Sequence, residues 1–154
     1  MGSDLKATHF SEKTTVIPAD AGIQELVLTC KDAYGNAYYD SALIERNSVI
    51  ESDYLQDAIE AGKSCGVKLI AYFNVLLDDK IADQFPEYRM IDSSGESVIA
   101  YDYYKILCPN SPYYEIIRDR IDDVVLRYDI EGVFLDITYF QPDTCFCESC
   151  RRKF

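Results

Sequence analysis

The chain has 154 residues, of which 48% are apolar, so it is long and apolar enough for one globular domain with a core. Its formal net charge of −12 repels phosphate backbones and anionic membranes, which argues against nucleic acid as a partner. No apolar run reaches the ~20 residues of a membrane span. The segment 1–4 has neither the basic nor the apolar region of a signal peptide, so we expect a cytoplasmic protein.

The first half of the chain alternates between strand and helix patterns. Residues 6–10 and the apolar run 23–30 read as strands, and Gly35 supplies a turn in the polar loop that follows. Ser52 and Asp53 can cap a helix that Gly66 ends. The strand predicted at residues 67–75 is almost continuously apolar, which is typical of a strand covered on both faces in a parallel sheet.

The second half contains a long excursion, a helix and a short strand. Residues 76–110 show little regular pattern beyond a helical turn at 78–84, and long loops of this kind are commonly functional. Ser111 and Pro112 form a helix start. That helix should bury one apolar face, made of Ile116, Ile117, Ile121, Val124, Val125 and Tyr128. It leads into a strand at residues 133–135, which ends at Asp136.

This order of elements predicts an α/β fold with parallel strands. A closed eight-fold barrel needs ~200 residues or more, so we interpret residues 1–154 as a single partial TIM-barrel domain holding about the first four βα units. A small complete doubly wound sheet is the alternative. An open partial barrel exposes strand edges, and such edges can support self-association.

The ends of the predicted strands carry polar residues that suit a binding site. Asp136 follows a buried strand, where α/β proteins place catalytic acids, although a structural acid or helix cap would look the same. Four further residues are candidate substrate contacts, and an ordinary surface loop explains them about as well: Lys31, Asp32, Tyr34 and Asn74.

Cys145, Cys147 and Cys150 follow at metal-ligand spacing, C-x-C-x₂-C. Zn²⁺ favours four sulfur ligands in a closed tetrahedral site, and Cys108 is the best fourth ligand because its loop lies on the same side of the sheet. Such a site leaves no position for water, so we expect a structural role for the zinc. Reduced thiols or one disulfide are the alternatives. The two remaining cysteines, Cys30 and Cys65, read as buried thiols.

Several segments together resemble a known family. Residues 26–35, LVLTCKDAYG, resemble the second-strand signature of α-L-fucosidase-like glycoside hydrolases, in which the lysine precedes two histidines, an aspartate and a glycine. Lys31 and Gly35 match that signature, whereas Asp32, Ala33 and Tyr34 stand where the histidines and the aspartate would be. With residues 67–74, 108–114, 128–136 and the cysteine cluster, the ordered set is similar to the family called hypothetical glycosyl hydrolase 6.

The resemblance implies a carbohydrate substrate and a role for each site. In fucosidase-like enzymes the nucleophile is an aspartate at the end of the fourth strand, and Asp136 falls on that position. Zinc-bearing bacterial β-galactosidases place their acid/base glutamate there, and they have a similar cysteine pattern. Glycoside hydrolysis needs a second carboxylate, normally from a later strand, and Asp32 is a weak local candidate. The alternative is a non-catalytic carbohydrate-binding or interaction module with a structural zinc knot.

Overall fold

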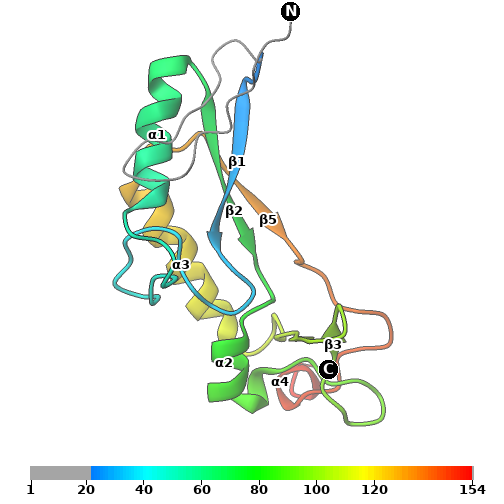
Figure 1. Ribbon diagram of the computed structural model, residues 1–154. Coiled ribbons are helices and arrows are strands. Elements are labelled where there is room, and N and C mark those ends of the chain that lie inside the picture. The colour runs from blue at the N-terminus through cyan, green and yellow to red at the C-terminus, as the bar shows by residue number, and fades with distance from the viewer. Residues whose placement is uncertain (1–21, 154) are drawn as a thin grey trace, which may run out of the picture.

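The computed structural model describes residues 22–153, so the strand expected at residues 6–10 lies outside the described part (Figure 1). Three strands form one parallel sheet in the order β1-β2-β5, namely β1 (Glu25–Lys31), β2 (Lys68–Asn74) and β5 (Gly132–Asp136). A parallel sheet was predicted from the alternation of strands and helices, and the structure confirms it. The strand ends differ by one or two residues from those expected.

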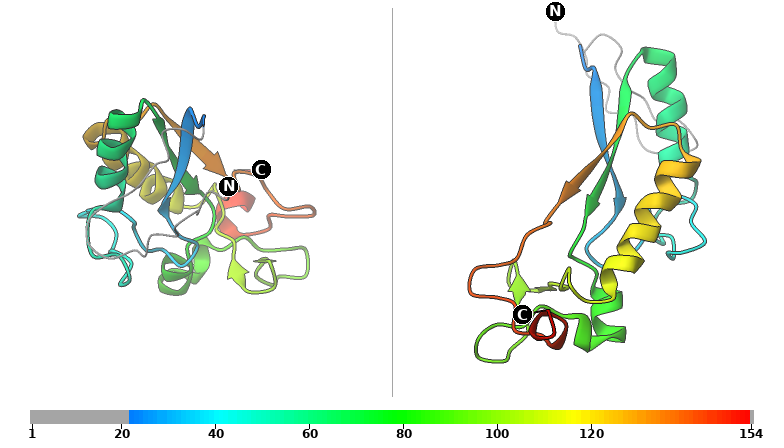
Figure 2. Two further views of the ribbon diagram at one scale, coloured as in Figure 1. Left: turned by 45° about the horizontal axis from the view of Figure 1, so that its top comes forward. Right: turned by 180° about the vertical axis from the view of Figure 1, so that it is seen from behind.

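Two long helices connect these strands and lie on the same face of the sheet, α1 (Tyr54–Cys65) and α3 (Tyr113–Arg127) (Figures 1 and 2). The predicted caps of α1 are present, because the Asp53 carboxylate accepts a hydrogen bond from the Gln56 backbone N–H at 3.0 Å and Gly66 ends the helix with φ 71°. Among residues 22–153, every helix is too short or too polar to cross a membrane.

The core lies between these helices and the sheet. Leu55 and Ile59 of α1, Ile117 of α3, and Leu69 and Phe73 of β2 are all buried there. The opposite face of the sheet is bare within residues 22–153, so the expectation that both faces are covered was wrong for this part of the chain. That face presents Val27, Thr29, Ile70, Tyr72 and Phe134, of which Val27 and Phe134 are each 50% exposed.

Helix α3 differs from its predicted pattern at Val125, and it buries one charged residue that the pattern left unassigned. Val125, expected on the apolar face, is 48% exposed, whereas Arg120 is buried. Arg120 reaches the carboxylate of Asp78, and this ion pair explains how a guanidinium can lie inside the protein.

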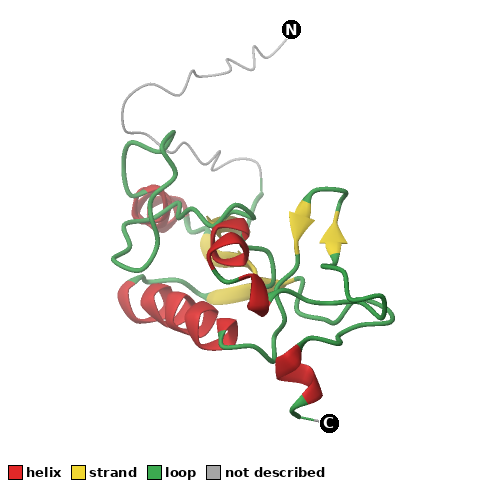
Figure 3. Cartoon of the chain, turned by 90° about the horizontal axis from the view of Figure 1, so that it is seen from below, coloured by secondary structure: helices red, strands yellow, loops and turns green. Residues whose placement is uncertain are grey.

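The excursion between β2 and α3 has more structure than its sequence indicates. It contains α2 (Asp79–Gln84), the 3-10 turn η1 (Pro86–Tyr88) and a hairpin of β3 (Ile99–Ala100) and β4 (Tyr104–Lys105). Scattered backbone bonds hold it, such as Leu107 N–H to the carbonyl of Leu76 at 2.9 Å. With the short helix α4 (Glu148–Arg151), it lies beyond the carboxyl ends of the strands (Figure 1), and Figure 3 views the molecule from that end.

Candidate active site and cysteine cluster

Asp136 is the last residue of β5 and is partly buried at the carboxyl end of the sheet. Its Oδ1 accepts a hydrogen bond from the backbone N–H of Ile137 at 2.8 Å, and its Oδ2 accepts one from the hydroxyl of Tyr72 at 2.7 Å. Both carboxylate oxygens are therefore oriented by rigid parts of the fold. Ile137 itself has φ 52°, so the chain turns sharply just after the carboxylate.

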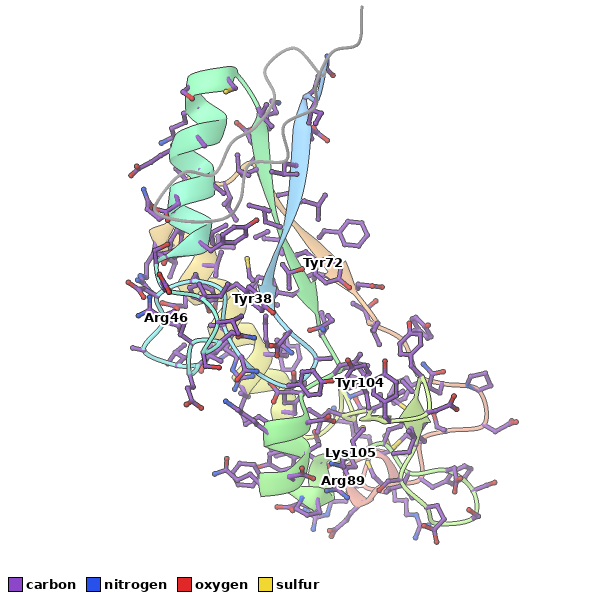
Figure 4. All side chains as sticks on the ribbon, in the orientation of Figure 1. Tyr38, Arg46, Tyr72, Arg89, Tyr104 and Lys105 are labelled. Carbon is purple, nitrogen blue, oxygen red and sulfur yellow. The ribbon has the colours of Figure 1, made fainter. Side chains whose placement is uncertain are left out.

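Tyr72 belongs to β2 and lies on the bare face of the sheet, toward β5 (Figure 4). Its ring stacks on Phe134 with centroids 5.8 Å apart. Partial burial, followed by the hydrogen bond and the charge of Asp136, together raise the pKa of Tyr72 to about 12. Tyr72 thus stays protonated and can donate to the carboxylate. Our sequence interpretation missed Tyr72, which pairs in register with Phe134, two residues before Asp136.

Asn74 ends β2 and pairs in register with Asp136 on the neighbouring strand. The residue is buried, and its side-chain carbonyl oxygen has no hydrogen-bond partner among the described residues. A buried oxygen without a partner costs stability, so this position favours a bound polar group. The two sequence-predicted residues at strand ends, Asn74 and Asp136, are therefore brought together.

Lys31 lies in the interior with no exposed side-chain surface. Its ammonium donates to the backbone carbonyls of Leu77 and Asp32 and lies 3.7 Å from the carboxylate of Asp78. The same carboxylate binds Arg120, so one buried carboxylate faces two cations. Lys31 consequently fixes the loop after β1 to the start of the excursion. Asp78 and Arg120 were not singled out from the sequence.

Asp32 and Tyr34 lie in the loop between β1 and α1. The Asp32 carboxylate accepts hydrogen bonds from the backbone and side-chain amides of Asn36 and from the side-chain amide of Asn47 at 2.8 to 3.3 Å, which organises the loop. Tyr34 is 54% exposed and its ring contacts Tyr104 of the hairpin edge-on. Of these two residues, Tyr34 is therefore the one whose side chain is open to a ligand.

The four predicted metal ligands come together. The Sγ atoms of Cys108, Cys145, Cys147 and Cys150 all lie within 4.8 Å of one another. A tetrahedral zinc with Zn–S bonds of about 2.3 Å separates its sulfurs by roughly 3.8 Å, so the spacing fits such an ion. The pair Cys108 and Cys150 is 3.4 Å apart. The four cysteines thus form a cluster compatible with a metal site, which we call the cysteine cluster.

Hydrogen-bond donors surround these sulfurs. The backbone N–H of Ile91 points at Cys145 Sγ at 3.3 Å, that of Asn110 points at Cys108 Sγ at 3.4 Å, and the Asn110 side-chain amide points at Cys150 Sγ at 3.3 Å. Such donors stabilise thiolate charge, which is what metal ligation by cysteine requires. Lys153 adds a positive charge through its bond to the Asn110 side-chain oxygen at 3.0 Å.

The thiols differ in their readiness to ionise. Burial raises the pKa of Cys108 and raises that of Cys147 to about 11. For Cys145 burial also acts upward, but hydrogen bonds from the backbone N–H groups of Ile91 and Cys147 and from the thiols of Cys147 and Cys108 together outweigh it and lower the pKa. The other two cysteines lie apart from the cluster. Cys30 is buried as expected, whereas Cys65 is only partly buried, which corrects its prediction.

The cysteine cluster joins segments that are distant in sequence. Besides the four sulfurs, Phe146 N–H bonds to the carbonyl of Ile91 at 2.8 Å, and Asp92 forms a bridge with Thr144. These contacts fasten the excursion to the segment after β5. Because that segment directly follows Asp136, the cluster also limits where the chain beyond the carboxylate can go.

The chain has clear relatives. The profile of the family described as hypothetical glycosyl hydrolase 6 matches residues 12–137. α-L-Fucosidase isoenzyme 2 from Paenibacillus thiaminolyticus is 31% identical, with a TM-score of 0.76 over 84% of this chain and 20% of that one. Thermotoga maritima α-fucosidase in complex with fucose is 18% identical, with a TM-score of 0.52 over 73% of this chain and 25% of that one. No curated protein sequence matches.

Fold and relatives together define a glycoside-hydrolase-related α/β domain. The chain belongs to the hypothetical glycosyl hydrolase 6 family, which confirms the resemblance found in the sequence. It spans about a fifth of the length of the Paenibacillus fucosidase. A hypothetical protein from Ruminiclostridium thermocellum, 13% identical with a TM-score of 0.59, shares the fold over 84% of this chain and 70% of its own.

Proposed function

We propose that this domain acts on O-glycosidic bonds of carbohydrates and that Asp136 is its catalytic carboxylate. The observation that carries the proposal is the placement of Asp136 at the carboxyl end of a parallel strand, with both oxygens held by Tyr72 and Ile137. The family and the fucosidase similarity support a sugar as substrate, and α-L-fucosides are the first candidates.

The chemistry follows from this geometry. An oriented carboxylate can attack the anomeric carbon of a glycoside and form a glycosyl ester, which water later hydrolyses. The stacked rings of Tyr72 and Phe134 present an aromatic surface beside it that suits the C–H face of a sugar. A second carboxyl group must protonate the leaving oxygen. Asp32 is engaged with the Asn36 and Asn47 amides, so we do not assign it that role.

The other residues named from the sequence divide into two groups. We propose Asn74 and Tyr34 as substrate contacts, because Asn74 has an unpaired oxygen beside Asp136 and Tyr34 has an open ring face. Lys31 and Asp32 act by holding the loop that carries Tyr34, since their polar atoms bond within the protein.

We further propose that the sheet is part of a TIM barrel made of about four βα units, of which the described residues hold three strands. In a barrel the helices surround the sheet and the inner face is closed by other strands. The bare face with Val27 and Phe134 corresponds to that interior. The outer edges of β1 and β5 can also pair with a second copy, and sedimentation velocity at rising concentration tests such self-association.

We propose a structural Zn²⁺ in the cysteine cluster. Four thiolates leave no open coordination position, so the ion would stabilise the fold and take no part in hydrolysis. Four thiolates of one zinc site stay reduced in a reducing compartment, so we propose the cytoplasm as the location of the protein.

Covalent trapping tests the role of Asp136. A 2-deoxy-2-fluoro-α-L-fucosyl fluoride needs no general acid, because fluoride leaves as the free anion when the carboxylate oxygen bonds to the anomeric carbon. Mass spectrometry of the digested protein should find the sugar on the peptide that contains Asp136, and Asp136→Asn should carry none. Asp129→Asn is the matched control, because Asp129 is an exposed acid paired with Lys63 and it should leave labelling unchanged.

Trapping combined with an NMR titration of L-fucose separates the two candidate functions, hydrolysis of a glycoside and binding of a carbohydrate alone. If L-fucose shifts the NMR signals of the protein but the fluoride leaves no adduct, the domain binds carbohydrate without catalysing its hydrolysis. That second function is favoured by one observation, namely that Asp32 and Ala33 stand where fucosidase-like enzymes carry histidines. An adduct on another residue would overturn the assignment of Asp136.

A further inference from the structure

Four tyrosines gather beyond the carboxyl ends of the strands, and we call them the tyrosine ledge: Tyr34, Tyr101, Tyr103 and Tyr104. Tyr34 comes from the loop after β1 and the other three from the β3–β4 hairpin. Tyr34, Tyr101 and Tyr103 are 54%, 66% and 60% exposed, so large aromatic surfaces face solvent. Exposed aromatic residues concentrated in one place are a sign of a binding surface.

The rings of the ledge support one another. Tyr34 and Tyr104 meet edge-on with centroids 5.4 Å apart, and Tyr103 and Tyr104 are 4.3 Å apart and tilted by 59°. Tyr104 is the half-buried centre of this set and fixes the other two. Figure 4 shows Tyr104 beyond the ends of β1 and β2. A preordered aromatic surface loses little conformational entropy when a ligand binds.

The backbone of the hairpin tip is unusual. Tyr101 and Asp102 have φ values of 53° and 68°, and the N–H of Tyr103 bonds to the carbonyl of Ala100 at 3.2 Å. A turn with two positive φ values normally contains Asn and Gly, and a bulky residue there is strained. The strain places an aromatic ring at the tip where a glycine would make the easier turn, and such strain is typical of functional positions.

The ledge adjoins the candidate active site. The hairpin lies at the carboxyl end of the sheet, the same end as Asp136 (Figure 1). Ionisation of Tyr101 is the smallest of the causes that raise the pKa of Tyr72, after burial and Asp136, which agrees with this placement. Tyr72 itself donates a hydrogen bond to Asp136, so the ledge and the carboxylate lie at the same end of the sheet.

We propose that the tyrosine ledge is a second sugar subsite, which stacks on the pyranose ring on the leaving side of the glycosidic bond. This proposal rests on the proposed function of Asp136. A ring face covers the C–H groups of a pyranose while the hydroxyls of tyrosine and sugar stay in contact with water. The substrate class is therefore an oligosaccharide with at least two rings, and not a glycoside of a small alcohol.

Binding of one sugar and of a longer one that contains it tests the ledge. The probes are L-fucose and the trisaccharide 2′-fucosyllactose, and protein-observed NMR titration gives both dissociation constants. We expect the wild type to bind the trisaccharide about tenfold more tightly, a difference that stacking can supply. Tyr103→Ala and Tyr101→Gly should abolish that advantage. Glycine adopts positive φ readily, so Tyr101→Gly removes the ring without disturbing the turn.

Tyr114→Ala is the matched control, because Tyr114 is a similarly exposed tyrosine on α3 and should leave the ratio of affinities unchanged. Equal affinity of the wild type for both sugars overturns the proposed subsite at the ledge. Tighter binding of the trisaccharide that persists in both ledge variants overturns it as well. Neither result bears on the proposed role of Asp136. Failure of both sugars to bind the wild type overturns the proposed function and the ledge together.

Discussion

The hydroxyl of Tyr72 donates a hydrogen bond to Oδ2 of Asp136 over 2.7 Å, from the central strand of the sheet to its neighbour. Tyr72 pairs in register with Phe134, so its hydroxyl reaches two residues further along β5 to the carboxylate. The direction of the carboxylate is thus set by strand pairing, which is among the more rigid relationships in the fold. A catalytic group benefits from such support, because positional errors of about 1 Å reduce rates strongly.

Replacing Asp136 with asparagine should lower the pKa of Tyr72. Burial raises that pKa most, and the hydrogen bond and charge of Asp136 raise it further, to about 12. A neutral amide removes the charge and weakens the hydrogen bond but leaves the burial, so the pKa should fall and still exceed 10. Titration of tyrosine ¹³Cζ signals measures it, with Tyr72→Phe assigning the resonance. An unchanged titration would contradict the hydrogen bond.

The cysteine cluster should hold one metal ion. We expect elemental analysis to find about one zinc per chain in the wild type and little in Cys108→Ser and Cys147→Ser. Cys65→Ser is the matched control, since Cys65 lies outside the cluster. Loss of zinc should also lower the melting temperature, because ion binding contributes directly to folding. Full occupancy in Cys108→Ser would show that another group provides the fourth ligand.

Gly35 and Gly95 allow the stability cost of a positive φ to be measured apart from the cost of steric overlap. Gly35 and Gly95 both have φ 91°, but a β-carbon on Gly35 overlaps the Asp78 carboxylate, whereas one on Gly95 meets open space. Gly95→Ala should cost about 1–2 kcal/mol from the left-handed conformation alone. Gly35→Ala should cost roughly 2 kcal/mol more, because Asp78 is pushed from its buried cations. Urea denaturation measures both, and equal losses would show that Asp78 moves freely.

Stability should depend on pH through Lys31. Burial lowers its pKa to about 8 from 10.5, although Asp78 acts in the opposite direction. Between these values the unfolded chain binds a proton that the folded chain has released, so the free energy of unfolding rises with pH. Burial raises the pKa of Tyr39 from 10.0 to about 12, so the unfolded chain loses this proton before the folded chain does. Above pH 10 this difference lowers the free energy of unfolding. The effect of Lys31 should therefore be measured below pH 10.

The measurement compares wild type with Lys31→Met by urea denaturation at about pH 7.5 and about pH 9.5. Taking the difference between the two proteins removes the titration of other groups. The stability of the wild type relative to the variant should increase with pH. A constant difference would show that Asp78 holds the Lys31 ammonium fully charged throughout.

Much of the architecture could be predicted because local patterns and tertiary structure agree. The cap at Asp53, the stop at Gly66 and the strand ending at Asp136 are determined by neighbouring residues. The excursion after β2 was predicted only at its helical turn, which is α2, since isolated bridges and a two-residue ladder hold the rest and leave no periodic pattern. The burial of Arg120 could not be predicted for a similar reason, because it depends on Asp78 forty-two positions away.

The parts of the site that form short sequence motifs could be predicted. The spacing of Cys145, Cys147 and Cys150 identified the cysteine cluster, and a topological argument added Cys108. Lys31 was predicted as a substrate contact from its position after a strand. In the structure it is buried beside Asp78, and the local sequence gives no sign of this ion pair. Tyr72 was overlooked, since a tyrosine in an apolar strand gives no signal of its neighbour across the sheet.

The attachment of the excursion has a practical consequence for anyone who prepares this protein. The hairpin with Tyr101 and Tyr103 belongs to the same segment that Cys108 and Ile91 fasten to the cysteine cluster. Under the proposed zinc ligation and sugar binding, a chelator or an oxidant would release the hairpin while the central sheet stays paired. The state of the cysteines should therefore be checked before any weak carbohydrate binding is interpreted.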